Sequence, residues 1–401
     1  MAGLAGLALQ KGYKVTGQDK AYFPPMSNQL KLLGIKENRT EDPVEDLKKS
    51  DAVIIGNSQS RGNKSVEYIL DNNHEYYSGP EWIKENILKN KYVFVVSGTH
   101  GKTTTTSMLI KILEDNNKNP SFLVGGIYKE GNVSYKYTDS DFFIIEGDEY
   151  DTSFFDKRSK FFHYKPNTLI INNLEFDHSD IFENIDQIKK QFHFLIRTMP
   201  SNSNIIYNND DPNIQSLLSM GCWANKQHYK RIKSIPNIYG EHNLKNASAS
   251  IAAAKLIGIN EIESIKALEE FAGVKRRLEL VENERFILYD DFAHHPTAIS
   301  SSIEAVKSMH PSKKISVIFE IRSNSMVSGS HEKTFVDSLD NADELYIYSK
   351  KEVSWLKKYP DIKIYDNSKN IVNKLNENID NVDIVIVMSN GDTSDIIKQL
   401  N

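Results

Sequence analysis

A glycine-rich turn at residues 98–104 has the residue types that hold the phosphates of a nucleotide. Glycines at 98 and 101 let the backbone approach a phosphate closely. The amine of Lys102 is suited to reach the β and γ phosphates, and the hydroxyl of Thr103 to bind Mg²⁺. The general phosphate-loop pattern places its first glycine at Ser97 or earlier, so the alternative is a turn that only caps a helix. The candidate residues are Gly98, Thr99, His100, Gly101, Lys102, Thr103 and Thr104.

Carboxylates gather after a second apolar segment. Glu146 ends this segment, which begins at Asp141, and three further acids follow it at 148, 149 and 151. A strand-end acid in a phosphate-loop protein holds Mg²⁺ directly or through water. Four neighbouring acids repel one another unless a cation is present, so the pattern favours a metal site over a solvated acidic turn.

A histidine between two acids follows a third apolar segment, Thr168–Asn173. His178 lies between Asp177 and Asp180, and such a histidine can be a second metal ligand or a catalytic group. A lone histidine is more often structural, so the functional interpretation depends on the other two strand ends.

Three strands and one helix must position these groups. The segments Tyr92–Val96, Asp141–Glu146 and Thr168–Asn173 are rich in β-branched and aromatic residues, which predicts buried strands. Residues 103–114 predict an amphipathic helix after the glycine turn. Because ligands bind at the carboxyl ends of strands in α/β sheets, we expect the three polar loops to meet at one sheet edge.

A second α/β region is predicted from about residue 285 onward. Its strands are expected at 286–291, 315–320, 344–348 and 384–388. Polar residues again follow these strands, so we expect this region to close over the nucleotide. Just before it, Arg276 and Arg277 lie in a glycine-flanked turn that could contact phosphate, although a solvated basic turn fits the residues equally well.

The N-terminal segment has the pattern of the second half of a βαβ nucleotide-binding unit. Residues 1–12 predict a helix that ends at a glycine, Tyr13–Gly17 predicts a strand, and Asp19 follows it. The first strand and its glycine turn are expected before residue 1, which indicates a truncated chain or a start codon assigned too late. The alternative is a surface helix at a natural terminus. Another strand is predicted at Asp51–Gly56, followed by the polar loop Asn57–Asn63.

The composition is that of a soluble globular protein. Its 401 residues, 39% hydrophobic and 26% charged, predict two or three domains. The net charge of −5 gives no reason to expect nucleic acid or an anionic membrane as a partner. Cys222 is the only cysteine, which excludes an intramolecular disulfide and fits a reducing cytosol. No apolar run approaches the roughly 20 residues of a membrane helix.

Six motifs together resemble those of the Mur ligases, the ATP-dependent enzymes that form amide bonds in peptidoglycan metabolism. They are residues 98–105, 146–151, 173–178, 240–246, 276–277 and 291–296. The resemblance covers essentially the whole chain and implies an α/β protein with the three-domain Mur ligase architecture. The implied domains are a truncated Rossmann-like domain at 1–90 for the UDP-sugar, a central P-loop ATPase domain at 91–275 and a C-terminal Rossmann-like ligase domain at 276–401.

Within the family, three segments are most similar to the members that recycle murein peptides: 150–160, 176–182 and 322–326. This resemblance implies that the chain joins the tripeptide L-Ala-γ-D-Glu-meso-diaminopimelate to UDP-N-acetylmuramate. ATP would phosphorylate the muramic acid carboxylate, and the free amine of the peptide would attack the acyl phosphate. The alternatives are the alanine-adding activity of the same family and a nucleotide-binding protein without enzymatic activity. The oligomeric state stays open.

The resemblance also assigns roles to ATP- and metal-binding residues. Those implied in catalysis are Lys102, His178 and Arg277. One Mg²⁺ would be held by Thr103 and Glu146 and a second by His178. The remaining contacts with ATP are implied at Asn243 or Asn246 for the adenine, Arg276 or Arg277 for the γ-phosphate and Asp291 for the ribose.

Substrate contacts are expected in both outer domains. The candidates are Asn57 and Ser58 in the N-terminal loop and Arg322, Ser323 and Asn324 after a C-terminal strand. A guanidinium suits a carboxylate, so Arg322 is expected to bind the acidic tail of the peptide. The alternative is an interdomain salt bridge. Several relatives carry a carbamylated lysine where this chain has Phe192 and His193, so no carbamylation is predicted.

Overall fold

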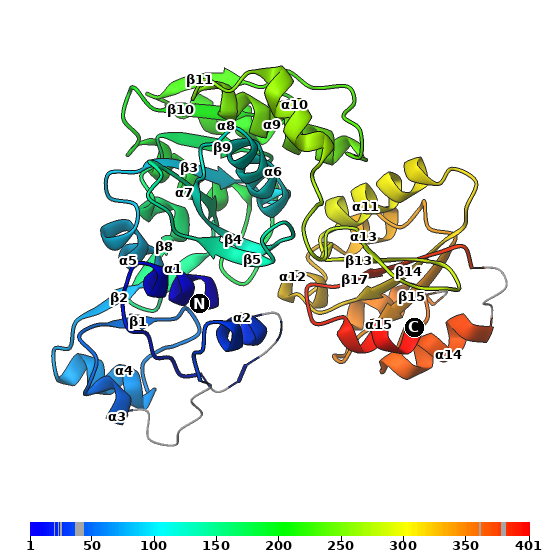
Figure 1. Cartoon of the computed structure of the whole chain (residues 1–401). Coiled ribbons are helices and arrows are strands. Elements are labelled where there is room, and N and C mark those ends of the chain that lie inside the picture. Colours follow the sequence, from blue (N-terminus) through cyan, green and yellow to red (C-terminus); the bar gives the residue numbers. More distant parts are fainter. Residues whose placement is uncertain (20, 23, 25, 37–43, 361, 378–381) are drawn as a thin grey trace. The chain divides into compact units, whose positions relative to one another are not determined.

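The structure, a computed structural model, describes residues 1–401 except 20, 23, 25, 37–43, 361 and 378–381. Figure 1 shows its helices and strands, which divide into two units. The first unit contains residues 1–175, 185–230 and 246–271, and the second contains 176–184, 231–245 and 272–401. The loop with His178 therefore belongs to the second unit, although the strand before it belongs to the first.

A seven-stranded sheet forms the centre of the first unit. Its order is β11-β10-β9-β3-β6-β4-β5, and only β5 runs antiparallel to its neighbour. The three predicted strands form β9, β3 and β6, which are adjacent and parallel, so their carboxyl ends lie together. The strands are β3 (Tyr92–Ser97), β4 (Ser121–Tyr128), β5 (Val133–Lys136), β6 (Phe142–Gly147), β9 (Thr168–Ile171), β10 (Asn204–Tyr207) and β11 (Asn225–His228).

Helices and one hairpin complete this part of the chain. The predicted helix after the glycine turn is α6, which packs against β3, β4 and β6. A short antiparallel hairpin, formed by β7 and β8, projects from the end of β6. The elements are α6 (Lys102–Asp115), β7 (Asp151–Ser153), β8 (Asp156–Ser159), the 3₁₀ helix η1 (Lys160–His163), α7 (Ile185–Ile196), α8 (Pro212–Ser219), α9 (Glu241–Lys255) and α10 (Glu261–Glu269).

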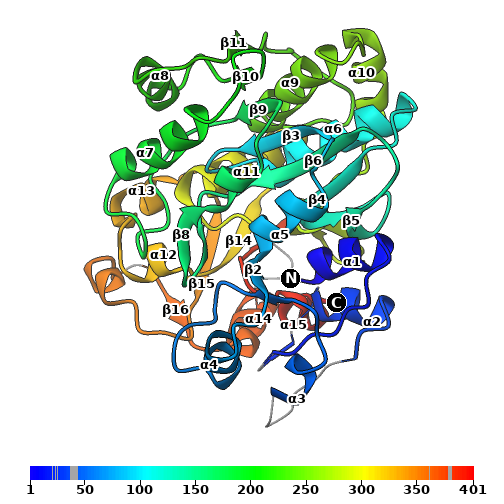
Figure 2. The same ribbon diagram turned by 90° about the vertical axis from the view of Figure 1, so that its left-hand side faces the viewer.

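The N-terminal residues of the first unit form a two-stranded parallel sheet and several helices. Helix α1 is apolar on all sides and therefore buried. It lies beside β5 in both views (Figures 1 and 2). The elements are α1 (Ala2–Gln10), α2 (Met26–Leu32), α3 (Val44–Leu47), β1 (Val53–Ile55), α4 (Lys64–Asp71), β2 (Tyr76–Ser78) and α5 (Gly79–Asn86).

The predicted strand at Tyr13–Gly17 is wrong. These residues have no strand pairing, and among the described residues β1 pairs with β2 alone. A segment becomes a strand only where a neighbouring backbone completes its ladder. The side chain of Tyr13 instead stacks edge-on against Trp82 at 5.5 Å and donates a hydrogen bond to Asn86 Oδ1 at 3.1 Å.

The second unit is built on a six-stranded sheet of order β12-β13-β17-β14-β15-β16, in which only β12 is antiparallel. The four predicted strands form β13, β14, β15 and β17. The elements are β12 (Glu279–Val281), β13 (Ile287–Asp291), α11 (Pro296–Met309), β14 (Ile315–Glu320), α12 (Asn324–Val327), α13 (Glu332–Asp337), β15 (Glu344–Tyr348), η2 (Ser354–Lys358), β16 (Ile364–Tyr365), α14 (Ser368–Glu377), β17 (Ile384–Met388) and α15 (Ser394–Leu400).

The predicted α/β class is confirmed by these two largely parallel sheets. In the described part of the chain, no helix combines the length and the apolar character that crossing a bilayer requires.

Close packing of α1 gives a first prediction. A Cβ atom added at Gly6 would lie 2.1 Å from Cζ of Tyr135, whose ring is only 7% exposed. Gly6→Ala should therefore destabilise the protein by about 1–3 kcal/mol, although alanine normally stabilises a helix interior by about 1 kcal/mol. Urea denaturation measures the change. Gly17→Ala, where a Cβ meets nothing within 4 Å, is the control, and equal stability of both variants would contradict this packing.

Candidate nucleotide-binding site

The glycine turn between β3 and α6 needs both of its glycines. Gly98 and Gly101 have φ angles of 132° and 77°, which L side chains rarely adopt. A Cβ at Gly98 would lie 3.0 Å from the backbone oxygen of Asn173, and one at Gly101 would lie 2.5 Å from Oδ1 of Asn246. The turn therefore packs against the loop after β9 and against α9.

Lys102 begins α6 with its amine held inside the turn. Its Nζ donates to the backbone oxygen of Gly98 at 2.7 Å and to Oε2 of Glu149 at 3.0 Å. Burial alone would lower the pKa of Lys102, but the charges of Glu149, Asp148 and Glu146 outweigh it and raise this pKa. The lysine is therefore a partly buried cation, with a side chain 16% exposed, and Glu149, only 3% exposed, is its counterion.

Two oxygen groups suited to a hard cation lie beside this lysine. The Thr103 hydroxyl donates to Oε2 of Glu146 at 3.1 Å, and the Gly125 amide donates to Oε1 of the same carboxylate at 2.6 Å. Hydroxyl and carboxylate oxygens are the ligands that Mg²⁺ prefers. The donor set therefore fits the predicted metal.

The loop after β9 holds the other side of the turn. Oδ1 of Asn173 accepts the amide of His100 at 2.8 Å, and the amide of Glu175 donates to the Thr99 hydroxyl at 2.8 Å. The side chain of Asn172 donates to Oγ1 of Thr105 at 2.9 Å. The loops after β3, β6 and β9 thus meet at one sheet edge as predicted, as far as Glu175. Neither asparagine was predicted from the sequence to have a role. Their position directly after an apolar strand could have indicated one.

The other predicted ATP contacts are divided between the two units. Thr104 is half-buried in α6, and Asn246, beside Gly101, is 5% exposed in the first unit. Asn243 belongs to the second unit, where its side chain donates to the backbone oxygen of Tyr239 at 2.9 Å.

In the second unit, the two arginines have different surroundings. Arg276 lies 3.3 Å from Asp290 and donates to the backbone oxygen of Ser389 at 2.7 Å. The guanidinium of Arg277 lies over the ring of Phe292, 4.8 Å from its centroid. The contacts of Arg276 connect the ends of β13 and β17, which gives this arginine a structural role inside the unit.

Asp291 and His178 are both held by neighbours within the second unit. Asp291, 3% exposed, accepts the amide of Ala293 at 3.0 Å, and burial raises its pKa in spite of the nearby charge of Arg277. His178 has a φ of 58°, and its amide donates to Oδ1 of Asp177 at 2.7 Å. Ser325 donates to the same carboxylate oxygen at 3.2 Å.

The predicted substrate residues lie at two strand ends. Asn57, just after β1, donates its side-chain amide to Oδ1 of Asp151 at 2.7 Å, and Ser58 beside it is exposed. In the second unit, Arg322 lies just after β14 and is exposed. Its guanidinium packs so closely over Gly391 that any side chain at position 391 would overlap it. Ser323 caps α12 by accepting the amide of Met326, and Asn324 is exposed.

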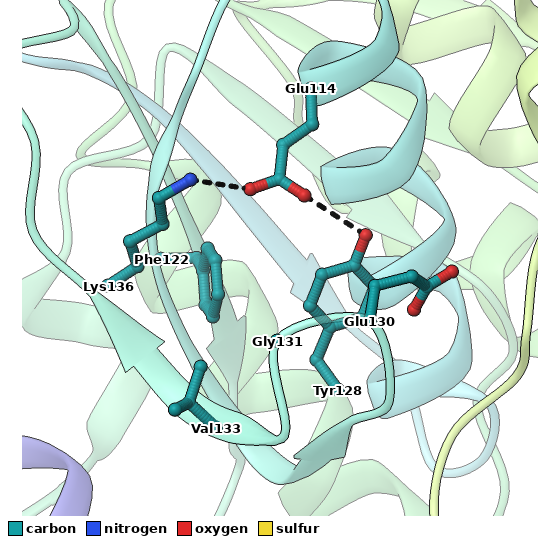
Figure 3. A pocket seen from close by; sticks show the side chains of 7 residues that line it. All are labelled: Glu114, Phe122, Tyr128, Glu130, Gly131, Val133 and Lys136. Atoms are coloured by element: carbon teal, nitrogen blue, oxygen red, sulfur yellow. Dashed lines mark hydrogen bonds and ion pairs between the residues drawn. The ribbon is translucent and has the colours of Figure 1, made fainter.

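A cavity of about 370 Å³ lies at the opposite end of α6 from the glycine turn. Figure 3 shows Glu114 between Lys136 and Tyr128, which it contacts at 2.7 and 3.1 Å. None of the predicted site residues lines it. Its lining residues are Glu114, Phe122, Tyr128, Glu130, Gly131, Val133 and Lys136.

Comparison with known proteins gives matches along the chain. Three family models match: the Mur ligase family catalytic domain at residues 1–91, the Mur ligase middle domain at 96–234 and the Mur ligase glutamate ligase domain at 276–391. A UDP-N-acetylmuramate–L-alanyl-γ-D-glutamyl-meso-2,6-diaminoheptandioate ligase of Haemophilus influenzae is 40% identical over 382 residues, covering 88% of this chain and 84% of its own. A UDP-N-acetylmuramate–L-alanine ligase of Clostridium tetani is 30% identical over 379 residues, covering 86% and 80%. A solved murein peptide ligase of Psychrobacter arcticus has a TM-score of 0.75 and 32% identity, covering 100% of this chain and 95% of its own.

The buried ion pair gives a prediction that separates stability from binding. Lys102→Ala leaves the carboxylate of Glu149 buried without its cation, which should cost about 3–5 kcal/mol. Adding Glu149→Gln removes this charge, so the double variant should regain most of the stability but not bind nucleotide. Urea denaturation and titration with a fluorescent ATP analogue measure the two effects. Lys111→Ala, which breaks the ion pair with Asp115 near the C-terminal end of the same helix, is the control. Normal nucleotide binding by the double variant would show that this turn is not the phosphate-binding site.

Proposed function

The chain belongs to the Mur ligase family, and on this premise we propose that it joins L-alanyl-γ-D-glutamyl-meso-diaminopimelate to UDP-N-acetylmuramate, with conversion of ATP to ADP and phosphate. The observation that carries the proposal is its 40% identity to a ligase named for these substrates, against 30% for one named for L-alanine. Such a reaction recycles murein peptides, and in this proposal the protein acts in the bacterial cytoplasm.

The proposed reaction has two steps. The muramic acid carboxylate attacks the γ-phosphorus of ATP, ADP leaves, and an acyl phosphate forms. The peptide amine then attacks the acyl carbon and loses a proton, and phosphate leaves from the tetrahedral intermediate. Negative charge shifts between oxygens in both steps, so cations matter more than a nucleophilic side chain.

In the proposal, residues of the first unit place positive charge beside the phosphates of ATP. Lys102 is already charged inside the glycine turn, and in the proposal it turns from Glu149 to the β and γ phosphates. Thr103 and Glu146 would hold Mg²⁺, and the ion would supply positive charge beside the transferring phosphate. Asn246, buried beside Gly101, is suited to the adenine region.

Residues of the second unit supply the remaining contacts. We propose His178 as the ligand of a second Mg²⁺ and Arg277 as the contact with the γ-phosphate. Arg277 is preferred to Arg276 because the latter is engaged by Asp290 and Ser389. Asp291 would accept a hydrogen bond from a ribose hydroxyl, and Asn243 would contact the adenine region.

The exposed guanidinium of Arg322 supports the proposal that the substrate is a peptide and not a single amino acid. A free amino acid has one carboxylate close to its attacking nitrogen, whereas the tripeptide carries several far from it. We propose that Arg322 binds a distant carboxylate, with Ser323 and Asn324 beside it. The alternative substrate is L-alanine, which uses the same ATP site.

The activity test measures ADP release with UDP-N-acetylmuramate and either acceptor. The proposal expects ADP release with the tripeptide to exceed that with L-alanine at equal concentrations. The opposite order would assign the chain to the alanine-adding activity, and no release with either would identify a nucleotide-binding homologue without ligase activity.

The metal assignment predicts a shift in Mg²⁺ dependence. Glu146→Gln keeps an oxygen for the Gly125 amide but removes the charge that attracts the ion. The half-saturating Mg²⁺ concentration should rise by about tenfold or more, with a small change in melting temperature. Glu114→Gln, at the far end of α6, is the matched control. An identical Mg²⁺ requirement in both variants would exclude Glu146 as a ligand.

The peptide assignment predicts a selective defect. Losing a charge-assisted hydrogen bond costs about 1.5–3 kcal/mol, so Arg322→Ala should raise KM for the tripeptide roughly ten- to a hundredfold. KM for ATP should hardly change. Lys351→Ala, another exposed cation just after a neighbouring strand, is the control. If the constants for ATP and peptide rose together, Arg322 would support the unit's structure instead of binding the peptide.

A further inference from the structure

The β7–β8 hairpin connects the acidic turn after β6 with the N-terminal residues of the first unit. At its base, the Ser159 hydroxyl donates to the backbone oxygen of Glu149 at 2.6 Å. Lys160, directly after the hairpin, pairs with Asp148 at 2.6 Å. The base of the hairpin is thus attached to the residue that holds Lys102.

The tip of the hairpin reaches the core around β1 and β2. Phe154 and Phe155 pack against the cluster of Leu47, Ile55, Val66 and Ile69. The ring of Phe155 meets that of Tyr76 edge-on at 5.0 Å. Aromatic contacts of this kind stabilise the packing of one element on another, so the tip of the hairpin is attached to the β1–β2 sheet.

A polar contact joins the hairpin to the loop after β1. The amide nitrogen of Asn57 donates to both the backbone oxygen and the carboxylate of Asp151, which begins β7. Asp151 is 9% exposed, and its other carboxylate oxygen pairs with Lys157 at 2.7 Å. A side-chain amide nitrogen has two hydrogens, and Asp151 takes both.

From this geometry we propose that Asp151 is a positioning residue for the sugar nucleotide. By holding Asn57, it fixes the loop Asn57–Asn63 with respect to the phosphate turn. Asn57 then acts through the placement of its loop, because both of its donor hydrogens are already used. The inference rests on the proposed function only in taking UDP-N-acetylmuramate as the ligand of this loop.

A charge-swap cycle tests the pair. Asn57→Asp places two carboxylates face to face, and the lost bond and repulsion should raise KM for UDP-N-acetylmuramate about ten- to a hundredfold. Asp151→Asn keeps an oxygen acceptor for Asn57, so its effect should stay within about threefold. In the double variant the new amide at position 151 can donate to the new carboxylate at position 57, which removes the charge repulsion. The backbone oxygen of residue 151 still lacks its donor, so KM should fall at least about threefold from the Asn57→Asp value without reaching the wild-type value.

Two controls separate this pair from general effects. Asn90→Asp adds the same charge to the same unit at an exposed residue outside this loop, and should change KM for the sugar nucleotide little. KM for ATP and the melting temperature should stay close to wild type throughout the cycle. A double variant no better than Asn57→Asp would overturn the inference and point to direct contact between Asn57 and the substrate. Parallel changes in the ATP constant would show that the hairpin only supports the fold.

Binding measurements keep this inference distinct from the proposed function. If the wild type binds UDP-N-acetylmuramate in a calorimetric titration but does not ligate the tripeptide, the proposed function fails. The Kd values of the same four proteins then test the pair, with the same expected order. A wild type that does not bind UDP-N-acetylmuramate at all would overturn both.

Discussion

The positive charge of Lys102 has to be held on a side chain that is only 16% exposed, and much of the first unit follows from this constraint. A buried ammonium without a partner would lose its proton or unfold the turn. The adjacent order of β9, β3 and β6 supplies the partner, because it places Glu149 and Glu146 beside the glycine turn. The same order places Asn173 against the backbone of His100. Charged and polar groups of three adjacent strand ends therefore hold one another in place, an arrangement suited to the proposed electrostatic catalysis of phosphoryl transfer.

The sequence predicted the elements that carry a strong periodic pattern. β3, α6, β6 and β9, and four strands of the second unit, appear within a few residues of their expected bounds. The choice of Glu149 as the partner of Lys102 could not be predicted, because it depends on which strands are neighbours in the sheet. The strand at Tyr13–Gly17 was wrong for a related reason: its local pattern is suitable, but a strand also needs a partner backbone.

Two features of the structure lay beyond local patterns. The β7–β8 hairpin is formed by short, mostly polar segments, and the sequence analysis did not predict that Phe154 and Phe155 at its tip pack against the core around β1 and β2. The loop with His178 follows β9 in sequence, yet its residues 176–184 group with the C-terminal unit, where Asp177 accepts from Ser325. Long-range contacts of this kind are decided by packing between segments far apart in the chain. The roles of individual site residues therefore stay proposals, whereas the family and the fold class are established.

The most direct test of the central claim, that the chain activates a carboxylate with ATP before forming an amide bond, follows oxygen atoms. UDP-N-acetylmuramate labelled with ¹⁸O on both carboxylate oxygens is incubated with ATP, Mg²⁺ and the tripeptide, and the released phosphate is examined by mass spectrometry. The account predicts one ¹⁸O in each phosphate released and one in the new amide carbonyl. Phosphate free of label, released together with unligated tripeptide, would show that water and not the muramic acid carboxylate receives the phosphoryl group, and would contradict the account.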